Sequence, residues 1–404
     1  MKITRIGIVG PLDRCEAYLH NLQYHFKNLK VAAICEQPGY SVQTLQELYQ
    51  IPEVYRTVDQ LLEDPKISIV LNLEGRSGQI DVTERALRAG KHVYADRLLA
   101  PDLQTARALD SQTSGAKASP CFCSGPDFIL APSVQTCRRI IDSGLIGEIT
   151  GAAAFIGDSG YEQWHFDPDG CYQNGNGPLW EWGELLVSEL AYLLGSVRSV
   201  SAAGRLRRQN RLITSASMQY GKLIRLNSFT TVQASLLFDH DVIASLQTSC
   251  DVFMHCHPGL EIYGTKGTLS VQNPCLGISP VRLYIEVGSP DGRIVSMKAY
   301  EHQYEPTGLG LWEMADAISE GREPRMLLQP ALHVQEVLEA IRDSADAGTP
   351  VRIQTPYLRG EPMPRPIPDP EEEEREQKEK EQSEKQDAER DALQAEAELE
   401  GMLP

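Results

Sequence analysis

The feature that most constrains this chain is the way its first apolar segment ends. Residues Ile3 to Val9 (ITRIGIV) form a short, mostly apolar run, which predicts a buried strand. Gly10 follows at once, and a helical pattern begins near Arg14. A strand that passes through one glycine directly into a helix is typical of a parallel sheet covered by helices.

The same position carries the G-x-G-x-x-G turn in dinucleotide-binding α/β domains. Here the three glycine positions hold Gly10, Leu12 and Cys15. Gly10 permits the tight turn, and Cys15 is small enough for helix–strand packing. The backbone at the second position must approach a pyrophosphate, which the side chain of Leu12 obstructs. Two interpretations stay open: the cofactor binds in an unusual way, or the site has decayed.

Strand and helix patterns alternate through roughly the first 120 residues. Further buried strands are expected at 31–35, 68–73 and 91–94, with helices after Ser41, at 81–89 and after Pro101. This alternation predicts an α/β fold with an N-terminal doubly wound parallel sheet of Rossmann type. We place this nucleotide-binding domain at residues 1–122.

After about Gly147, β-type segments follow one another, with one helical stretch from Leu179 to Leu194. Asp239–Asp241 and Thr265–Gly267 have the composition of hairpin turns. The pattern predicts a second, α+β domain at residues 123–355 with a largely antiparallel open sheet. Two amphipathic helices near its end are expected to pack back on the body.

Composition restricts the function classes. The net charge of −18 argues against a general nucleic-acid binder. The chain has no 18-residue apolar run and no signal-peptide pattern, so we expect neither a membrane span nor export. Nine irregularly spaced cysteines fit free thiols and a cytoplasmic location. The pairs at Cys121-x-Cys123 and His255-Cys256-His257 do not match a four-ligand zinc site, so no metal is expected.

The C-terminal end differs from the rest of the chain. Residues 356–370 are rich in proline and predict a stiff linker. Residues 371–404 form an acidic tail; from Asp369 to Glu400 there are 15 acidic and 5 basic residues. The tail has no heptad pattern, so a solvated, disordered or partly helical segment is expected rather than a coiled coil.

Five segments, in this order, resemble the glucose–fructose oxidoreductase / inositol dehydrogenase (Gfo/Idh/MocA) family over residues 1–355. They are AGKHVYADRLLA at 89–100, IIDSGLIGEI at 140–149, GYEQWHFDPDGCYQNGNGPLWEWGELL at 160–186, EIYGTKGTL at 261–269 and ALHVQEVLEAI at 331–341. The resemblance implies a Rossmann domain followed by an open-sheet domain. It also implies NAD-dependent hydride transfer at a hydroxyl of a sugar, cyclitol or similar polyol, in a homodimer or homotetramer.

At the residues that carry the family's chemistry, the chain departs from the pattern. The lysine of the family's E-K-P motif falls on Arg97, with Asp96 in place of the glutamate. A later aspartate falls on Glu181, and the usual histidine position is Leu185. Arginine stays protonated, so Arg97 can orient a hydroxyl but cannot relay a proton as lysine can.

The resemblance implies the following site residues: catalytic Arg97, Glu181 and His165; cofactor-binding Gly10, Leu12, Glu36, Asp96 and Arg97; substrate-binding Trp164, Asp167 and Glu184. Glu36 ends a strand where an acid holds a ribose hydroxyl, so we expect NAD to be preferred over NADP. The hypothesis for catalysis is that Glu181, with a pKa raised by burial, accepts the hydroxyl proton. His165 is the alternative acid–base group, or a structural histidine.

Other functions remain open. An Arg97–Glu181 ion pair would also fit a catalytically silent relative without a cofactor that binds a sugar-like ligand or a partner protein. A redox-neutral variant, NAD-assisted glycoside cleavage, is a further alternative. All three interpretations share the fold.

Overall fold

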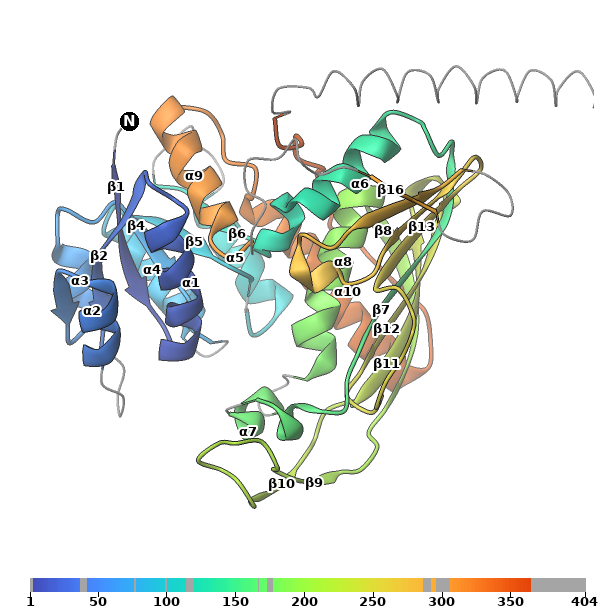
Figure 1. The fold of residues 1–404 in the computed structure, drawn as a ribbon, viewed down its shortest axis with the longest axis horizontal. Coiled ribbons are helices and arrows are strands. Elements are labelled where there is room, and N and C mark those ends of the chain that lie inside the picture. Colours follow the sequence, from blue (N-terminus) through green and yellow to red (C-terminus); the bar gives the residue numbers. More distant parts are fainter. Residues whose placement is uncertain are drawn as a thin grey trace, which may run out of the picture.

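The computed structural model describes residues 3–36, 42–75, 78–98, 100–113, 120–165, 167–172, 177–285, 292–295 and 306–364. Two sheets dominate the fold, one at each side of the molecule (Figure 1). Helices lie between and around them, and the short helix α7 (Pro168–Tyr172) and the ribbon β9–β10 project at the bottom of the view.

The N-terminal sheet has six parallel strands in the order β3-β2-β1-β4-β5-β6. The strands are β1 (Thr4–Val9), β2 (Leu29–Cys35), β3 (Glu53–Tyr55), β4 (Ile69–Asn72), β5 (His92–Ala95) and β6 (Phe122–Ser124). The strand order reverses between β1 and β4. In open α/β sheets, this crevice at the carboxyl ends of the strands is where ligands bind.

Helices cover both faces of this sheet, which confirms the doubly wound Rossmann prediction. They are α1 (Leu12–Tyr24), α2 (Gln43–Tyr49), α3 (Val58–Glu63), α4 (Gln79–Arg88) and α5 (Leu103–Thr113). Helices α1 and α2 contribute to one buried apolar cluster, and α3, α4 and α5 contribute to a second. The strands are therefore apolar on both faces, as their continuous apolar sequences predict.

The C-terminal sheet has nine strands in the order β16-β15-β14-β13-β7-β12-β11-β8-β17. They are β7 (Ile149–Gly157), β8 (Val197–Arg205), β11 (Thr231–Phe238), β12 (Ile243–Ser249), β13 (Leu260–Gly264), β14 (Thr268–Val271), β15 (Val281–Tyr284), β16 (Arg293–Ile294) and β17 (Val351–Arg352). Every pairing is antiparallel except that of β7 with β12. The largely antiparallel open sheet is confirmed.

One face of this sheet is covered by helices α6 (Pro132–Asp142), α8 (Pro178–Leu194) and α10 (Leu328–Ala347) (Figure 1). Strands β11 and β12 alternate buried and exposed residues, as a half-covered sheet requires. A two-stranded ribbon, β9 (Asn210–Leu212) with β10 (Leu223–Arg225), extends from the end of β8.

The chain returns to the first domain after the second sheet. Helix α9 (Leu309–Glu320) begins beside Asp127, whose carboxylate accepts hydrogen bonds from the backbone N–H of Gly308 and Gly310, both 2.7 Å. The same carboxylate accepts from the hydroxyls of Tyr18 and Tyr94. Burial raises the pKa of Asp127 to about 6 although these hydrogen bonds act to lower it. This carboxylate ties α1, β5 and α9 together.

Some element predictions differ from the structure in their bounds. The first helix begins at Leu12 rather than near Arg14. The helix expected to open at Pro101 begins at Leu103, because Asp102 Oδ1 accepts the backbone N–H of Thr105 at 2.8 Å and acts as a cap. Ser41 lies outside the described residues. No helix among the described residues is long and apolar enough to cross a membrane.

Candidate active site

The site is built first from the turn between β1 and α1. Gly10 has a φ of 145°, and a Cβ there would lie 2.7 Å from the backbone carbon of Leu73. Only glycine fits this close approach to the end of β4. Pro11 stands at the N-cap of α1 and gives it no side-chain hydrogen bond. The N-cap residue therefore offers no side-chain acceptor to the first N–H groups of α1.

The two other positions of the incomplete motif have structural roles. Leu12 is half-buried and packs against the large apolar cluster to which α1 contributes. Cys15 is fully buried, with its Sγ 3.4 Å from the carbonyl oxygen of Gly10. Both residues thus support the β1–α1 packing that glycines serve in the complete motif.

Arg14 crosses the crevice and was missed by the sequence analysis. Its Nη1 donates to the carbonyl oxygen of Leu73 at 3.0 Å, at the end of β4. Its Nη2 lies 2.7 Å from both carboxylate oxygens of Asp96, just beyond β5. The signal was present in the sequence, because Arg14 lies inside the motif between Leu12 and Cys15 and is the only cation there.

The predicted pair Arg97 and Glu181 meets in the structure. Arg97 Nη1 donates to Glu181 Oε2 at 2.7 Å, which joins the first domain to the first turn of α8. Arg97 Nε also lies 4.0 Å from Asp96 Oδ2, so Asp96 stands between the guanidinium groups of Arg14 and Arg97. Alternating charges therefore line the carboxyl ends of β4 and β5.

Arg97 and Glu181 each hold the other in its charged form. Burial acts to lower the pKa of Arg97, but the carboxylates of Glu181 and Asp96 outweigh it, and the pKa lies above its ordinary value. Burial acts to raise the pKa of Glu181, but Arg97 and Arg14 outweigh it and the pKa is lowered. The expectation of a net rise in the pKa of Glu181 is therefore wrong, because the cation in direct contact with it outweighs the effect of burial.

Glu184 is the carboxyl group of this cluster whose pKa is raised. It lies one turn beyond Glu181 on α8 and is 7% exposed. Burial raises its pKa to about 8, and the charges of Asp96 and Glu181 add to that shift while Arg97 opposes it. Leu185, at the family's histidine position, is buried and carries no ionisable group.

The end of the crevice beside β2 is acidic. Glu36 is exposed directly after β2, and its backbone N–H donates to the carbonyl of Tyr55 at 2.7 Å. Burial raises the pKa of the neighbouring Cys35 thiol to about 11, with further contributions from Glu74 and Glu36. The position of Glu36 matches that of an acid on a ribose hydroxyl.

The segment from Tyr161 to Tyr172 holds the remaining predicted residues. Trp164 is 55% exposed and its indole N–H donates to Asp158 Oδ2 at 2.7 Å. His165 is half-buried, and its Nδ1 accepts the backbone N–H of Asp167 at 3.0 Å. Asp167 Oδ1 accepts from Gln219 Nε2 at 2.8 Å, so its carboxylate joins this segment to the ribbon β9–β10.

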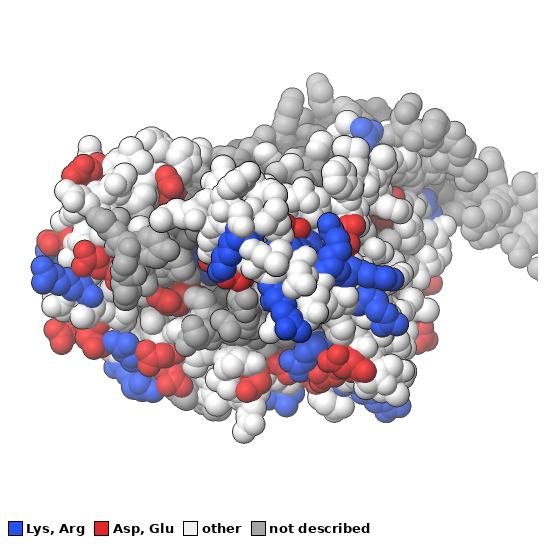
Figure 2. Space-filling view, turned by 90° about the horizontal axis from the view of Figure 1, so that it is seen from below, with Lys and Arg blue, Asp and Glu red and all other residues white. Residues whose placement is uncertain are grey.

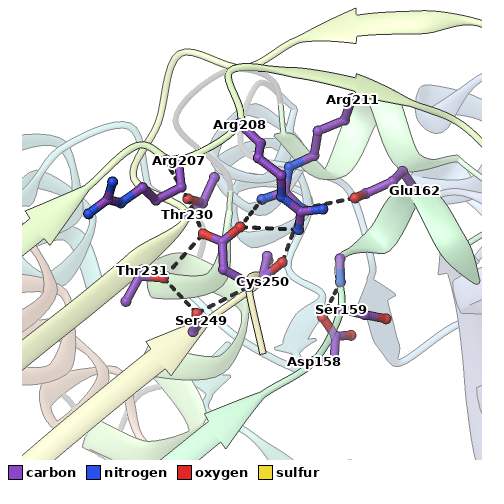
Figure 3. Close-up of polar contacts among 12 residues, drawn as sticks. Asp158, Ser159, Glu162, Arg207, Arg208, Arg211, Thr230, Thr231, Ser249 and Cys250 are labelled. Carbon is purple, nitrogen blue, oxygen red and sulfur yellow. Dashed lines mark hydrogen bonds and ion pairs between the residues drawn. The ribbon is translucent and has the colours of Figure 1, made fainter. Parts of the chain in front are cut away.

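A buried polar network holds that segment in place (Figure 3). Arg211 on β9 donates to Glu162 Oε1 at 2.9 Å and to Asp251 Oδ1 at 2.7 Å. Glu162 Oε2 also accepts from the Tyr172 hydroxyl at 2.7 Å. Arg211 and Glu162 are 3% and 4% exposed, so this is a desolvated ion pair with several supporting hydrogen bonds. Sequence analysis missed it, although the run RLRRQNR contains Arg211.

Tyr161 connects the segment to α8. Its ring lies 5.2 Å from that of Trp182 and 5.7 Å from that of Trp164, measured between centroids. Its hydroxyl is buried with no hydrogen-bond partner among the described residues. Because Trp182 directly follows Glu181, the segment packs against the helix that carries the ion pair.

The cysteines and possible metal ligands fit no centre in the described part of the chain. All nine cysteines are free. No three His, Cys, Asp or Glu residues among those described are grouped to hold a metal ion.

The sequence of this chain is similar to those of known protein families and of named dehydrogenases. Residues 4–117 match the oxidoreductase family with an NAD-binding Rossmann fold, and residues 134–270 match the GFO/IDH/MocA C-terminal domain. Dehydrogenase aclE of Aspergillus oryzae is 23% identical over 372 residues, which cover 86% of this chain and 97% of that protein. D-xylose dehydrogenase of Paenarthrobacter nicotinovorans is 23% identical, with 73% and 79% covered.

The solved structures show the same fold. Levoglucosan dehydrogenase in complex with NADH and L-sorbose has a TM-score of 0.73 at 16% identity, covering 87% of this chain and 99% of that one. Both parts of the chain thus match one family in the order that the family requires. The chain belongs to the GFO/IDH/MocA oxidoreductase family, with an N-terminal domain of the NAD-binding Rossmann type.

Proposed function

We propose that this protein is an NAD(H)-dependent oxidoreductase that transfers a hydride at a hydroxyl-bearing carbon of a sugar, cyclitol or similar polyol. The observation that carries the proposal is the charged cluster at the crevice, where Arg97 contacts Glu181 at 2.7 Å beside Glu184. The names of the relatives support the substrate class, since they include a D-xylose dehydrogenase and a levoglucosan dehydrogenase.

The residues present fit a dinucleotide at three points. Gly10 makes the close turn, the N-cap residue Pro11 gives α1 no side-chain hydrogen bond, and Glu36 is exposed after β2. The nicotinamide, when bound, supplies the hydride acceptor or donor. Gly10 and the backbone at Leu12 would face the pyrophosphate, and Arg14 would supply a positive charge beside it. Glu36 would favour NAD over NADP, because a 2′-phosphate would meet a like charge.

The reaction also needs a side chain that exchanges the proton of the substrate hydroxyl. Glu181 stays ionised in contact with Arg97, so it holds the guanidinium rather than exchanging protons. Arg97 can then orient the reacting hydroxyl through its remaining N–H groups. Glu184, with a pKa of about 8, holds a proton at neutral pH and releases it slightly above, which suits a general acid–base group. We assign the proton exchange to Glu184.

The Tyr161–Tyr172 segment supplies the sugar contacts in this proposal. Trp164 is exposed while its indole N–H is fixed by Asp158, so the ring is held in a defined orientation. Such a ring stacks well on the apolar face of a sugar. His165 keeps a role in substrate binding or as a second proton donor. Asp167 is assigned to positioning, because Gln219 and the first turn of α7 use its carboxylate.

A second candidate function has its own observation. The Arg14–Asp96 and Arg97–Glu181 ion pairs link side chains around the crevice directly to one another. The same arrangement would preserve the fold in a catalytically silent relative that binds a sugar-like molecule or a protein.

A panel assay separates the two candidates. The protein is incubated with NAD+ and a set of aldoses, cyclitols and anhydrosugars, and NADH absorbance is followed. The proposal expects NADH formation with at least one compound and its loss in Arg97→Met. The exposed Arg56→Met serves as the matched control. NADH formation with no compound, in a protein that binds sugars, would favour the silent relative.

A further inference from the structure

The ribbon β9–β10 carries an unusual concentration of positive charge. Residues 205–229 contain six basic residues and no acidic one, in a chain whose net charge is −18. Five of the six are exposed: Arg205, Arg207, Arg208, Lys222 and Arg225. Figure 2, which views the molecule from the side of this ribbon, shows Lys and Arg side chains gathered on that face. We call these five residues and their ribbon the basic ribbon.

Few of these charges are neutralised within the body of the protein. Arg208 lies 3.3 Å from Asp251, and Lys222 pairs with Asp169. Around the other three, Arg205, Arg207 and Arg225, no carboxylate of the described residues comes within ion-pair distance. Unpaired cations grouped on one surface create a local positive potential that attracts an anionic partner.

The basic ribbon also has an apolar strip. Leu212 and Leu223 are paired across the two strands and are 53% and 65% exposed, while Arg211 and Ile224 beside them are buried. The outer face of the ribbon therefore combines a leucine pair with arginines. Such a surface fits an acidic polypeptide that carries occasional leucines better than it fits a small anion.

The chain itself contains such a polypeptide. Residues 369–400 have 15 acidic and 5 basic residues, with Leu393 and Leu399 among them. The described chain ends at Pro364, at the other end of the molecule from the ribbon (Figure 1). The 36 residues from there to Glu400 reach roughly 120 Å when extended, at about 3.3 Å per residue. A body of about 360 residues has a radius of gyration of only about 21 Å, so the tail can reach the ribbon.

We propose that the acidic tail of this chain docks intramolecularly on the basic ribbon. Opposite charge supplies the attraction, and the leucine pair supplies a contact for the leucines of the tail. Because both partners belong to one chain, the effective concentration is in the millimolar range, so weak contacts suffice. The ribbon contacts the Tyr161–Tyr172 segment through Gln219 and Lys222, so a docked tail lies beside the segment that carries Trp164.

Hydrogen exchange of the full-length protein tests this docking. Backbone amides of residues 205–226 are compared at low salt in the wild type and in a variant with the eight glutamates of residues 371–384 changed to glutamine. We expect exchange at least about threefold faster in the variant, and the same acceleration of the wild type in 1 M salt, where screening acts within about 3 Å. The turn at Asp239–Asp241 should be unaffected. Equal exchange in both proteins at low salt would overturn the proposal.

A second measurement uses the ribbon side. The triple variant Arg205→Glu, Arg207→Glu and Arg225→Glu should show a larger hydrodynamic radius than the wild type at low salt, because the tail is released. The matched control reverses three exposed cations of the first domain, Lys30→Glu, Arg56→Glu and Lys66→Glu, and should leave the radius unchanged. An equal radius in the ribbon variant and the wild type would contradict docking. Protection that is lost on dilution, with a dimeric mass, would mean docking on a second copy and would overturn the intramolecular proposal.

Discussion

Arg97 and Glu181 are 84 residues apart in the chain and belong to different domains, yet their side chains are in direct contact at 2.7 Å. The side chains are only 24% and 35% exposed, so each charge is partly desolvated and depends on the other. The contact therefore depends both on how the two domains are arranged and on the electrostatics of the site.

The coupling within this pair can be measured directly. Arg97→Met and Glu181→Gln should each destabilise the protein, because each leaves a partly buried charge without its partner. The double variant should be less unstable than the sum, with a coupling energy of about 1 kcal/mol in urea unfolding. Additive effects would contradict the pairing. Turnover that is unchanged in Glu181→Gln would also show that Glu181 is not the base.

Removal of Arg14 should weaken NADH binding. Its guanidinium contacts both carboxylate oxygens of Asp96, and without it a pyrophosphate at the N-terminus of α1 would approach a carboxylate that keeps only its 4.0 Å contact with Arg97. We expect Arg14→Ala to raise the Kd for NADH by about tenfold, a loss of about 1.4 kcal/mol, and Arg14→Lys to have a smaller effect. Tighter binding by Arg14→Ala would show instead that Arg14 blocks the crevice.

The pH dependence of turnover should report Glu184. If Glu184 accepts the hydroxyl proton, oxidation of the polyol should accelerate as the pH rises through about 8, where this carboxyl ionises. Glu184→Gln should slow turnover by 10²-fold or more, in line with the usual contribution of a general base, and should lose that pH limb. Glu339→Gln, on α10, is the control. An unchanged pH profile in Glu184→Gln would exclude the assignment.

Glu189 should destabilise the protein at alkaline pH. It is completely buried, neither carboxylate oxygen has a hydrogen-bond partner among the described residues, and burial raises its pKa to about 8. A carboxyl whose pKa is higher in the folded state contributes stability that is complete below its unfolded pKa, near 4.5, and is lost as the pH rises through 8.

The variant Glu189→Leu removes this titration. We expect it to gain a few kcal/mol over the wild type at pH 9 relative to their difference at pH 5, measured by urea unfolding at both values. Glu189→Gln separates charge from polarity, because its amide is buried but does not ionise. The same dependence of stability on pH in wild type and Glu189→Leu would contradict this account.

The sequence predicts the fold well because the fold follows from the local strand and helix patterns and from their order along the chain. The run from Ile3 to Val9, the helix ending at Leu194 and the turn at Asp239–Asp241 each have a strong local signal, and the structure confirms these elements. Short elements such as β3 (Glu53–Tyr55) were missed, because three residues with one polar end show no period.

The site was harder to predict, since its chemistry depends on tertiary contacts. Arg97 and Glu181 could be paired from the family pattern, but the lowered pKa of Glu181 follows from a distance that sequence does not contain. Arg14 and Arg211 were missed for the same reason: their partners, Asp96 and Glu162, lie 82 and 49 residues away. The fold decides which charged residues of a sequence face each other.

The most direct test of the central claim is calorimetric titration with NADH and NADPH, after absorbance has shown that no nucleotide co-purifies. We expect NADH to bind with a micromolar or lower Kd and more tightly than NADPH, because of Glu36. The preference for NADH over NADPH should be smaller in the variant Glu36→Ser. If neither nucleotide binds at millimolar concentration, the dehydrogenase proposal fails and the crevice is a site for another ligand or partner.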